Sequence, residues 1–305
     1  MADGHMPTAT APARLRPLFG ELGDLKRIRS AGREGSVAQR GFRQAWCELA
    51  AGEAPEVVTK RTVAAALAAA RLGDLDGPKL RELGLPADAA LAVLRAGFDT
   101  VAGPLDPALA AILREGVSLD PRPEHGAPGF VHDLERQPRA GATCPGKPRV
   151  VLEPPENHAE HCWAVAVFGV LLSPAYGADP VEVFTAGLAH HLHNALMPDS
   201  GFTGEVLLGD RLTDVIDHAT AHALLQLDEP VRDTVRAARR ILPDASTPEG
   251  RAFHAADVID RVMQIAQHLR PATITMGTVL DDLGLVHDGP VKPFHDRVLA
   301  EMGLP

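Results

Sequence analysis

Three histidines and a carboxylate in one short stretch have the types and spacing of a metal site. His190, His191 and His193 lie in "GLAHHLHNALMPD" (residues 187–199), and Asp199 follows nine residues after the first histidine. Imidazole is the commonest protein ligand for transition metals, usually beside a carboxylate. A helix turns about 100° per residue, so adjacent histidines inside a regular helix point in different directions. They can share an ion near a helix end, and Pro198 predicts such an end nearby. The alternative is the polar side of an ordinary helix.

The surrounding half of the chain is enriched in histidine. Nine of the fourteen histidines lie between His158 and His268, although histidine is an ordinary helix former at best. A metal site inside a helical bundle would explain this, since its ligands can come from several helices. His161 precedes an almost wholly apolar helix, which predicts a buried neighbourhood. His218 and His222 stand at i, i+4, which can hold a metal, but without an HExxH glutamate a pocket-lining or structural role is favoured.

Three motifs resemble those of the HD-domain superfamily, in particular its 5′-deoxynucleotidase-like branch. They are "ENHAEHCWAVAV", "GLAHHLHNALMPD" and "HAADVIDRV", and the resemblance covers residues 149–270. It implies an HD-like helical bundle that binds one divalent transition metal, with Fe, Mn, Co, Ni and Zn all open. The ligands that it implies are His161, His190, His191 and Asp257. Asp257 belongs to a polar stripe of its helix, so a solvated position is the alternative for it.

Two positions depart from the pattern of that branch. His191 stands where the family has the Asp of its His-Asp pair, and Asn194 stands where the branch has an acid–base Glu. A neutral imidazole cannot bridge two ions as a carboxylate does, so His191 argues for one metal. Asparagine can orient a water but cannot take its proton at neutral pH. Asp199, which keeps the family's acidic position, and His193 are therefore the nearest candidates for proton transfer.

A basic pair precedes the first motif. Lys147 and Arg149 lie in "GKPRVVLEPPEN", close to where the branch has an Arg that holds phosphate. Arg suits phosphate because its planar fork donates two parallel hydrogen bonds. The resemblance thus implies that this pair binds an anion, with His218 and His222 lining the same pocket. A solvated loop is the alternative for the pair.

Helices are predicted to position all of these residues, so the expected fold is all-α. Apolar residues recur at helical spacing in residues 42–53, 59–73, 85–101, 105–116, 158–172, 179–196, 210–227, 229–242, 248–270 and 291–303. Between Val117 and Asn157 the chain holds eight prolines and four glycines, which predicts an irregular connection with room for a short strand at residues 150–152.

The predicted organisation has four parts. They are a disordered leader (1–12), an N-terminal helical region that acts as scaffold or dimerisation domain (13–116), a Pro/Gly-rich connection (117–148) and an HD-like metal-binding helical domain (149–305). No glycine-rich phosphate loop and no internal repeat is present. Function is therefore expected in the C-terminal part.

Composition excludes several function classes. The formal net charge of −10 argues against a broad nucleic-acid surface. No apolar run has the length of a membrane span. Cys47, Cys144 and Cys162 form no CxxC pair, which favours a reducing compartment, and the start lacks an apolar signal core, so a cytoplasmic protein is expected.

The resemblance implies an enzyme, a metal-dependent hydrolase acting on a nucleotide or another small phosphate ester. The expected partner is thus a small molecule, and a homodimer is compatible with the sequence. An HD-like non-haem iron oxygenase is an alternative, which would use His218 and His222 for a second iron. A divergent HD-like protein that binds or dimerises without catalysis is another, for which His191 and Asn194 are the argument.

Overall fold

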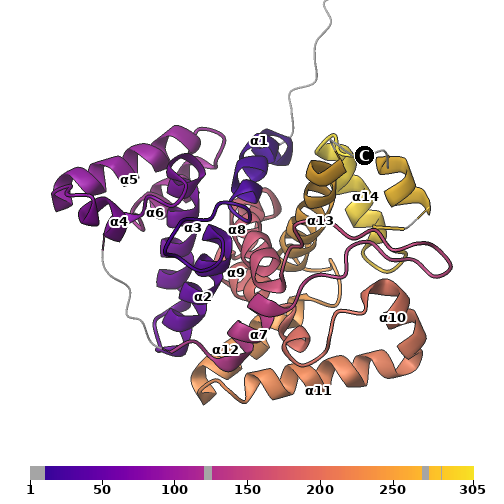
Figure 1. Ribbon diagram of the computed structural model, residues 1–305. Coiled ribbons are helices and arrows are strands. Elements are labelled where there is room, and N and C mark those ends of the chain that lie inside the picture. The colour runs from indigo at the N-terminus through magenta and orange to yellow at the C-terminus, as the bar shows by residue number, and fades with distance from the viewer. Residues whose placement is uncertain (1–10, 120–125, 270–274, 283) are drawn as a thin grey trace, which may run out of the picture.

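The fold is helical throughout the part of the chain that the structure describes. The computed structural model describes residues 11–119, 126–269, 275–282 and 284–305. In these ranges the regular elements are helices, and β pairing is limited to two isolated antiparallel bridges, Pro138 with Asn157 and Ala142 with Val150. The all-α prediction is confirmed (Figure 1). No described helix combines the length and the apolar character that crossing a membrane requires.

The helices of the N-terminal part come first. They are α1 (Ala11–Asp24), α2 (Val37–Ala50), α3 (Pro55–Leu72), α4 (Gly77–Glu82), α5 (Ala87–Val101), α6 (Pro107–Arg114) and α7 (Gly129–Arg136). The remainder are α8 (His158–Tyr176), α9 (Pro180–Ala189), η1 (Leu192–Ala195), α10 (Gly201–Leu208), η2 (Gly209–Arg211), α11 (Leu212–Leu224), α12 (Glu229–Ala238), η3 (Arg239–Ile241), α13 (Pro248–Leu269), η4 (Thr278–Asp282) and α14 (Lys292–Glu301).

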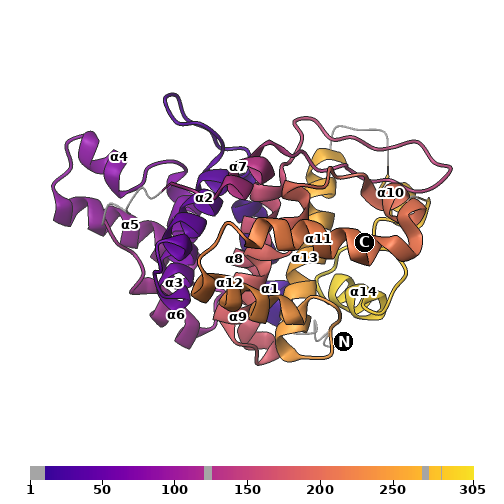
Figure 2. The ribbon, with the colours of Figure 1, turned by 90° about the horizontal axis from the view of Figure 1, so that it is seen from below.

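Helix α8 forms the centre of the molecule. Every residue from His158 to Ser173 is buried, as expected for a helix that is apolar on all sides. Figures 1 and 2 show α2 to α6 on one side of α8 and α9, with α13 and α14 on the other side. Buried side chains from both sides belong to one hydrophobic core. The N-terminal helices therefore pack directly on the helices that carry the predicted ligands.

Several predicted boundaries are wrong in an informative way. Helix α8 continues through Pro174 to Tyr176 and ends at Gly177, which adopts the left-handed conformation (φ 66°). A proline in the last turn interrupts little of the helix, so burial of the apolar surface prevails. The helix predicted over residues 179–196 ends earlier, at Ala189.

The Pro/Gly-rich connection is more ordered than predicted. It contains helix α7, whose Phe130, Val131 and Leu134 are buried. The expected strand at residues 150–152 is reduced to the bridge between Ala142 and Val150. Helix α10 was also not predicted, because its apolar residues lack a clear period. Residues 1–10 of the expected leader lie outside the described residues, and 11 and 12 already belong to α1.

Two glycines allow α8 and α9 to approach closely. A Cβ on Gly187 would lie 2.6 Å from the Ala166 Cα, and a Cβ on Gly169 would lie 2.5 Å from the Val183 Cγ1. At Gly187 the opposing atom is backbone and cannot rotate away. The helix-to-helix distance, and with it the position of the histidines after α9, therefore depends on Gly187.

We expect Gly187→Ala to lower the free energy of unfolding by about 1–3 kcal/mol, the typical effect of overpacking a core. Gly20→Ala is the matched control, because its new Cβ would meet only the Met263 Cε at 3.7 Å. That variant should gain about 0.5–1 kcal/mol from replacing a glycine inside a helix. Urea unfolding measures both, and equal effects of the two substitutions would contradict the close-packing argument.

Candidate metal centre

The first turn of α8 holds His161 in place. Asn157 and Glu160 form a capping box, in which the Asn157 side chain accepts the Glu160 N–H and the Glu160 carboxylate accepts the Asn157 N–H. The Ser36 hydroxyl, from the N-terminal part, donates to Glu160 Oε1 at 2.6 Å. A capping box satisfies two otherwise unpaired backbone donors. His161, the next residue, is therefore fixed at the start of a buried helix.

A change of helix type brings His190 and His191 together. Helix α9 ends at Ala189, His190 is its C-cap, and His191 leaves the helical region with φ −103° and ψ 22° before the 3₁₀-helix η1 begins. The guanidinium of Arg239 donates to the Ala189 carbonyl at this helix end. Because the chain turns between the two residues, adjacent imidazoles can face one space. The helix end at Ala189 therefore explains how the two imidazoles converge.

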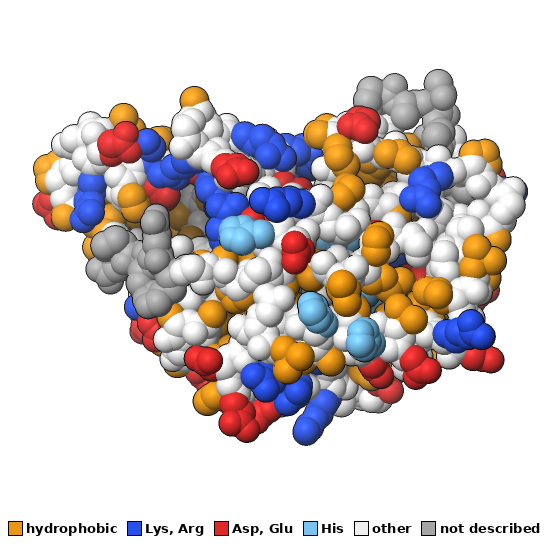
Figure 3. Space-filling model, turned by 60° about the horizontal axis from the view of Figure 1, so that its bottom comes forward, with side chains coloured by type: hydrophobic (Ala, Val, Ile, Leu, Met, Phe, Trp, Pro, Cys, Tyr) orange, Lys and Arg blue, Asp and Glu red, His pale blue; other side chains and the backbone are white. Residues whose placement is uncertain are grey.

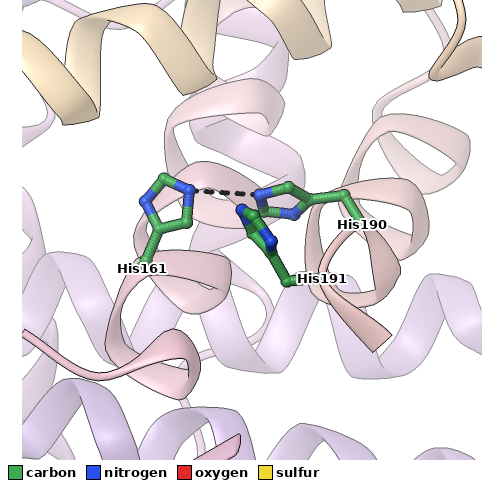
Figure 4. Close-up of side chains that lie close together, drawn as sticks. All are labelled: His161, His190 and His191. Carbon is green, nitrogen blue, oxygen red and sulfur yellow. Dashed lines mark hydrogen bonds between the residues drawn. The ribbon is translucent and has the colours of Figure 1, made fainter. Parts of the chain in front are cut away.

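The rings of His161, His190 and His191 surround that space (Figure 4). One nitrogen from each ring lies within 4.8 Å of the other two, and the Nε2 atoms of His161 and His190 are 3.1 Å apart. Two unprotonated imidazole nitrogens at that distance repel each other unless a cation or a shared proton lies between them. The arrangement thus fits a bound cation.

Each of the three imidazoles has an acceptor behind it. The Nδ1 atoms donate to Asp260 Oδ2 (2.8 Å, from His161), to the Gly187 carbonyl (2.6 Å, from His190) and to Asn194 Oδ1 (2.8 Å, from His191). Protonation at Nδ1 leaves the Nε2 lone pair free, and such contacts are usual behind metal-binding histidines. Burial lowers the pKa of His190 and of His191 well below the ordinary value, which keeps both rings neutral. The donor set therefore suits a transition metal.

Asp257 adds a carboxylate to the three imidazoles. Its Oδ1 lies 3.2 Å from His161 Nε2, and its Oδ2 lies 3.6 Å from the Arg261 guanidinium. Although burial raises the pKa of Asp257, its contact with the His161 ring and the charge of Arg261 hold it well below its usual range. The structure places Asp257 beside the histidines, within the polar stripe of α13 noted in the sequence. Four predicted ligands are thus brought together.

A pocket of about 290 Å³ opens on this cluster. Its polar wall includes Asp257, His190, His191, Arg139, Arg261, Asp199 and Glu205. Its apolar wall includes Leu152, Phe202, Ile265 and Leu285. Such a combination of apolar surface and a few convergent polar groups is typical of small-molecule sites.

Arg139 lines this pocket and has a buried side-chain nitrogen without a partner in the described part of the chain. Its backbone N–H donates to the Glu156 carbonyl at 2.8 Å, which fixes the residue opposite the start of α8. Its Nη1 is buried and has no hydrogen-bond partner among the described residues. Burial lowers the pKa of Arg139, but the charges of Glu156 and Asp199 more than compensate and raise it. A buried, charged and unpaired donor is costly, which points to an anionic ligand.

The predicted proton-transfer residues have other contacts. Asp199 lines the pocket but accepts the N–H groups of Ala140 (2.8 Å) and Gly201 (2.9 Å), and it lies 3.4 Å from His158 Nε2. Burial raises the pKa of Asp199, yet the neighbouring His158 ring and the charge of Arg139 hold it far below its usual range. A carboxylate this acidic orients groups better than it carries protons.

His193 and Asn194 lie behind the pocket wall. Asn194 accepts from His191 Nδ1 and donates to the Met197 carbonyl at 3.1 Å, so both ends of its amide are used inside the protein. The buried Nδ1 of His193 has no partner in the described part of the chain, and burial lowers the pKa of His193 to about 4. Neither residue is among those that line the pocket.

The four predicted substrate-binding residues lie elsewhere. His218 and His222 are exposed on α11 and do not line the pocket; Figure 3 shows exposed histidines among hydrophobic and charged side chains on the face that α11 helps to form. Lys147 is exposed, and Arg149 donates to the Ala140 carbonyl and to the Ser200 carbonyl, both at 3.3 Å. Lys147 is therefore in contact with solvent, and Arg149 binds the loop backbone. The chain reverses between Arg139 and this basic pair, as the bridge between Ala142 and Val150 shows.

Three residues of the site escaped sequence reasoning. Arg139 lies in the irregular connection, and Glu205 lies in a helix without clear periodicity, so neither had a sequence signal. Asp260 did have a sequence signal: it follows Asp257 by three residues, so the two side chains lie on the same side of α13.

We expect His161→Ala to abolish binding of Co²⁺ to the metal-free protein, because it removes a central ligand and the partner of Asp257. His218→Ala is the matched control, and it should bind one ion with unchanged affinity because His218 is exposed on α11. Absorption titration with cobalt reports both the affinity and the ligand set. Full metal content in His161→Ala would show that the site lies elsewhere.

Comparison with known proteins identifies a family for the part of the chain that carries this site. Residues 131–282 match the family model described as the HD domain. The match includes all four converging ligands and begins before residue 149, the predicted domain start. No curated protein and no solved structure matches the chain. The resemblance to the nucleotidase branch stays a prediction, whereas the superfamily is confirmed: the chain belongs to the HD-domain superfamily, whose members are mostly metal-dependent hydrolases.

Proposed function

We propose that this protein is a metal-dependent phosphohydrolase that acts on a nucleotide or another small phosphate ester. The observation that carries the proposal is the pairing of two features in one pocket. Three imidazoles and Asp257 form a candidate cation site, and Arg139, whose Nη1 has no partner among the described residues, lines the same pocket. Together they suit a ligand with a compact negative charge.

His161, His190, His191 and Asp257 would hold a single divalent metal. Such an ion supplies a Lewis acid for the phosphoryl oxygens and lowers the pKa of water. Arg139 would bind the non-bridging phosphoryl oxygens through its guanidinium, and Arg261 on α13 would add a second positive charge. His191 offers one donor atom where an aspartate would offer two, which supports one ion instead of two.

Glu205 is the best-placed proton carrier, since Asn194 cannot serve. It lines the pocket on α10. Burial and the charge of Asp199 raise the pKa of Glu205, so its protonated form is favoured relative to an ordinary glutamate. In hydrolysis, water adds to phosphorus, the ester P–O bond breaks, and the leaving alcohol oxygen takes the Glu205 proton. The attacking water then restores that proton to the carboxylate.

The apolar wall supports an organic leaving group. Leu152, Ile265 and Leu285 line the pocket together with Phe202, whose ring stacks on His287 at 3.9 Å between centroids. Planar rings pack favourably on such surfaces. A nucleoside monophosphate would bring phosphate to Arg139 and a planar base to this wall.

The oxygenase alternative lacks this support. It requires a second iron, for which His218 and His222 were the ligand candidates, and both are exposed on α11 outside the pocket. The binding-protein alternative is decided by activity: metal-loaded protein that is inert towards a panel of nucleoside monophosphates and sugar phosphates would favour it.

We expect the metal-loaded protein to release phosphate from at least one ester of that panel. Arg139→Met should lower kcat/KM by about 10- to 100-fold, because hydrogen bonds to charged groups contribute about 1.5–3 kcal/mol. Lys147→Met is the matched control, since Lys147 is exposed in the same connection. A loss confined to Lys147→Met would place the anion on the outer loop.

We expect Glu205→Gln to lower kcat by about 100-fold or more, within the range usual for loss of a general acid, with little change in KM. The basic limb of the kcat–pH profile, which reports deprotonation of the acid, should disappear in the variant. An unchanged kcat and pH profile would exclude Glu205 as the proton donor.

A further inference from the structure

Lys26 inserts a positive charge behind the metal centre. It lies in the turn after α1, and only 2% of its side chain is exposed. Its Nζ donates to Glu156 Oε1 at 2.5 Å and to Asp260 Oδ1. The other Asp260 oxygen accepts His161 Nδ1–H at 2.8 Å. One carboxylate therefore connects the ammonium of the N-terminal part to a metal ligand.

Two residues shortly after Lys26, Arg27 and Arg29, contact helices α13 and α8. Arg27 donates to Gln264 Oε1 at 2.9 Å, and Arg29 lies 3.5 Å from the Glu160 carboxylate. The turn itself is held by the hydrogen bond from the Ala38 N–H to the Leu25 carbonyl at 3.2 Å. A short basic segment thus meets α8 and α13, the helices that carry His161 and Asp257.

Lys26 is held in its charged form by the two carboxylates. Burial lowers the pKa of Lys26, but the charges of Asp260 and Glu156 outweigh it and raise the pKa above its ordinary value. Glu156, His161 and Asp260 also offer ligand atoms within 4.8 Å of one another, and the ammonium is the cation bonded to both carboxylates.

We propose that Lys26 is a positioning residue of the metal centre: it holds the Asp260 carboxylate against His161 Nδ1–H, which keeps His161 in the tautomer whose Nε2 faces the metal. This inference rests on the proposed metal site and gives the N-terminal region a part in it. Without the ammonium, the buried Asp260 carboxylate would lose the hydrogen bond that holds its Oδ1 and would reorient. His161 would then lose its fixed acceptor.

The test uses the full chain and Co²⁺ as the probe. We expect Lys26→Met to weaken cobalt binding about 10- to 100-fold, the usual effect of losing a residue that orients a ligand. Lys26→Arg keeps the charge and should restore most of the affinity. Lys60→Met is the matched control, because Lys60 pairs with Glu115 at the surface. Wild-type affinity in Lys26→Met would overturn the proposal.

A second variant addresses folding. Lys26→Met combined with Glu156→Gln leaves the net charge of the cluster unchanged, yet it still removes the cation from Asp260. ¹⁵N NMR of histidine rings in the metal-free protein, with the His161 signals identified through their loss in His161→Ala, should show the Nδ1–H tautomer in the wild type and a tautomer mixture in the double variant. An unchanged tautomer there would overturn the proposal. A wild type that binds no cobalt would refute the metal site itself, and the NMR result would still decide the role of Lys26.

Discussion

The candidate metal centre depends on how closely α8 and α9 pack. His161 lies in the first turn of α8, and His190 follows the last turn of α9, so the distance between the helices sets the distance between the ligands. The contact is close because Gly187 faces the Ala166 backbone without a side chain. The Gly187 carbonyl also accepts from His190 Nδ1 at 2.6 Å. One residue thus sets the helix separation and orients a ligand ring, and a well-packed interior permits little adjustment of either.

Around this packed pair, charge is balanced by residues far apart in the sequence. Asp257, Asp260 and Glu156 are carboxylates in or beside the centre, and their cations come from Arg261 on the same helix and from Lys26 in the N-terminal part. Removing water from a charge is costly unless a partner replaces it. The contact between the N-terminal helices and the HD domain therefore combines the shared apolar core with buried ion pairs beside the candidate ligands. Such buried pairs favour the one relative placement in which every charge has its partner.

The sequence predicted what local pattern determines. The apolar pattern identified α8, α9 and α13, and the motifs in or directly after these helices predicted four ligands that the structure brings together. Arg139, Glu205 and Lys26 could not be predicted, because each acts through a contact between distant segments: Lys26 and Asp260 are 234 positions apart. Lys147 and Arg149 were predicted to bind an anion because they are basic and precede the first motif. However, the irregular connection folds back on itself, and only the fold decides which of its cations enters the pocket.

His191 and Asn194, the two positions that depart from the pattern expected from the sequence, are linked by a hydrogen bond. A histidine at position 191 carries an Nδ1–H that needs an acceptor, and Asn194 Oδ1 accepts it at 2.8 Å. The same amide donates to the Met197 carbonyl at 3.1 Å, which a glutamate carboxylate could not do. Asn194 therefore orients the His191 ring and is itself held by the chain that follows it. In the proposed site this pair would supply an oriented ligand but no proton carrier. A hydrolytic centre built in this way must draw its proton from another wall of the pocket.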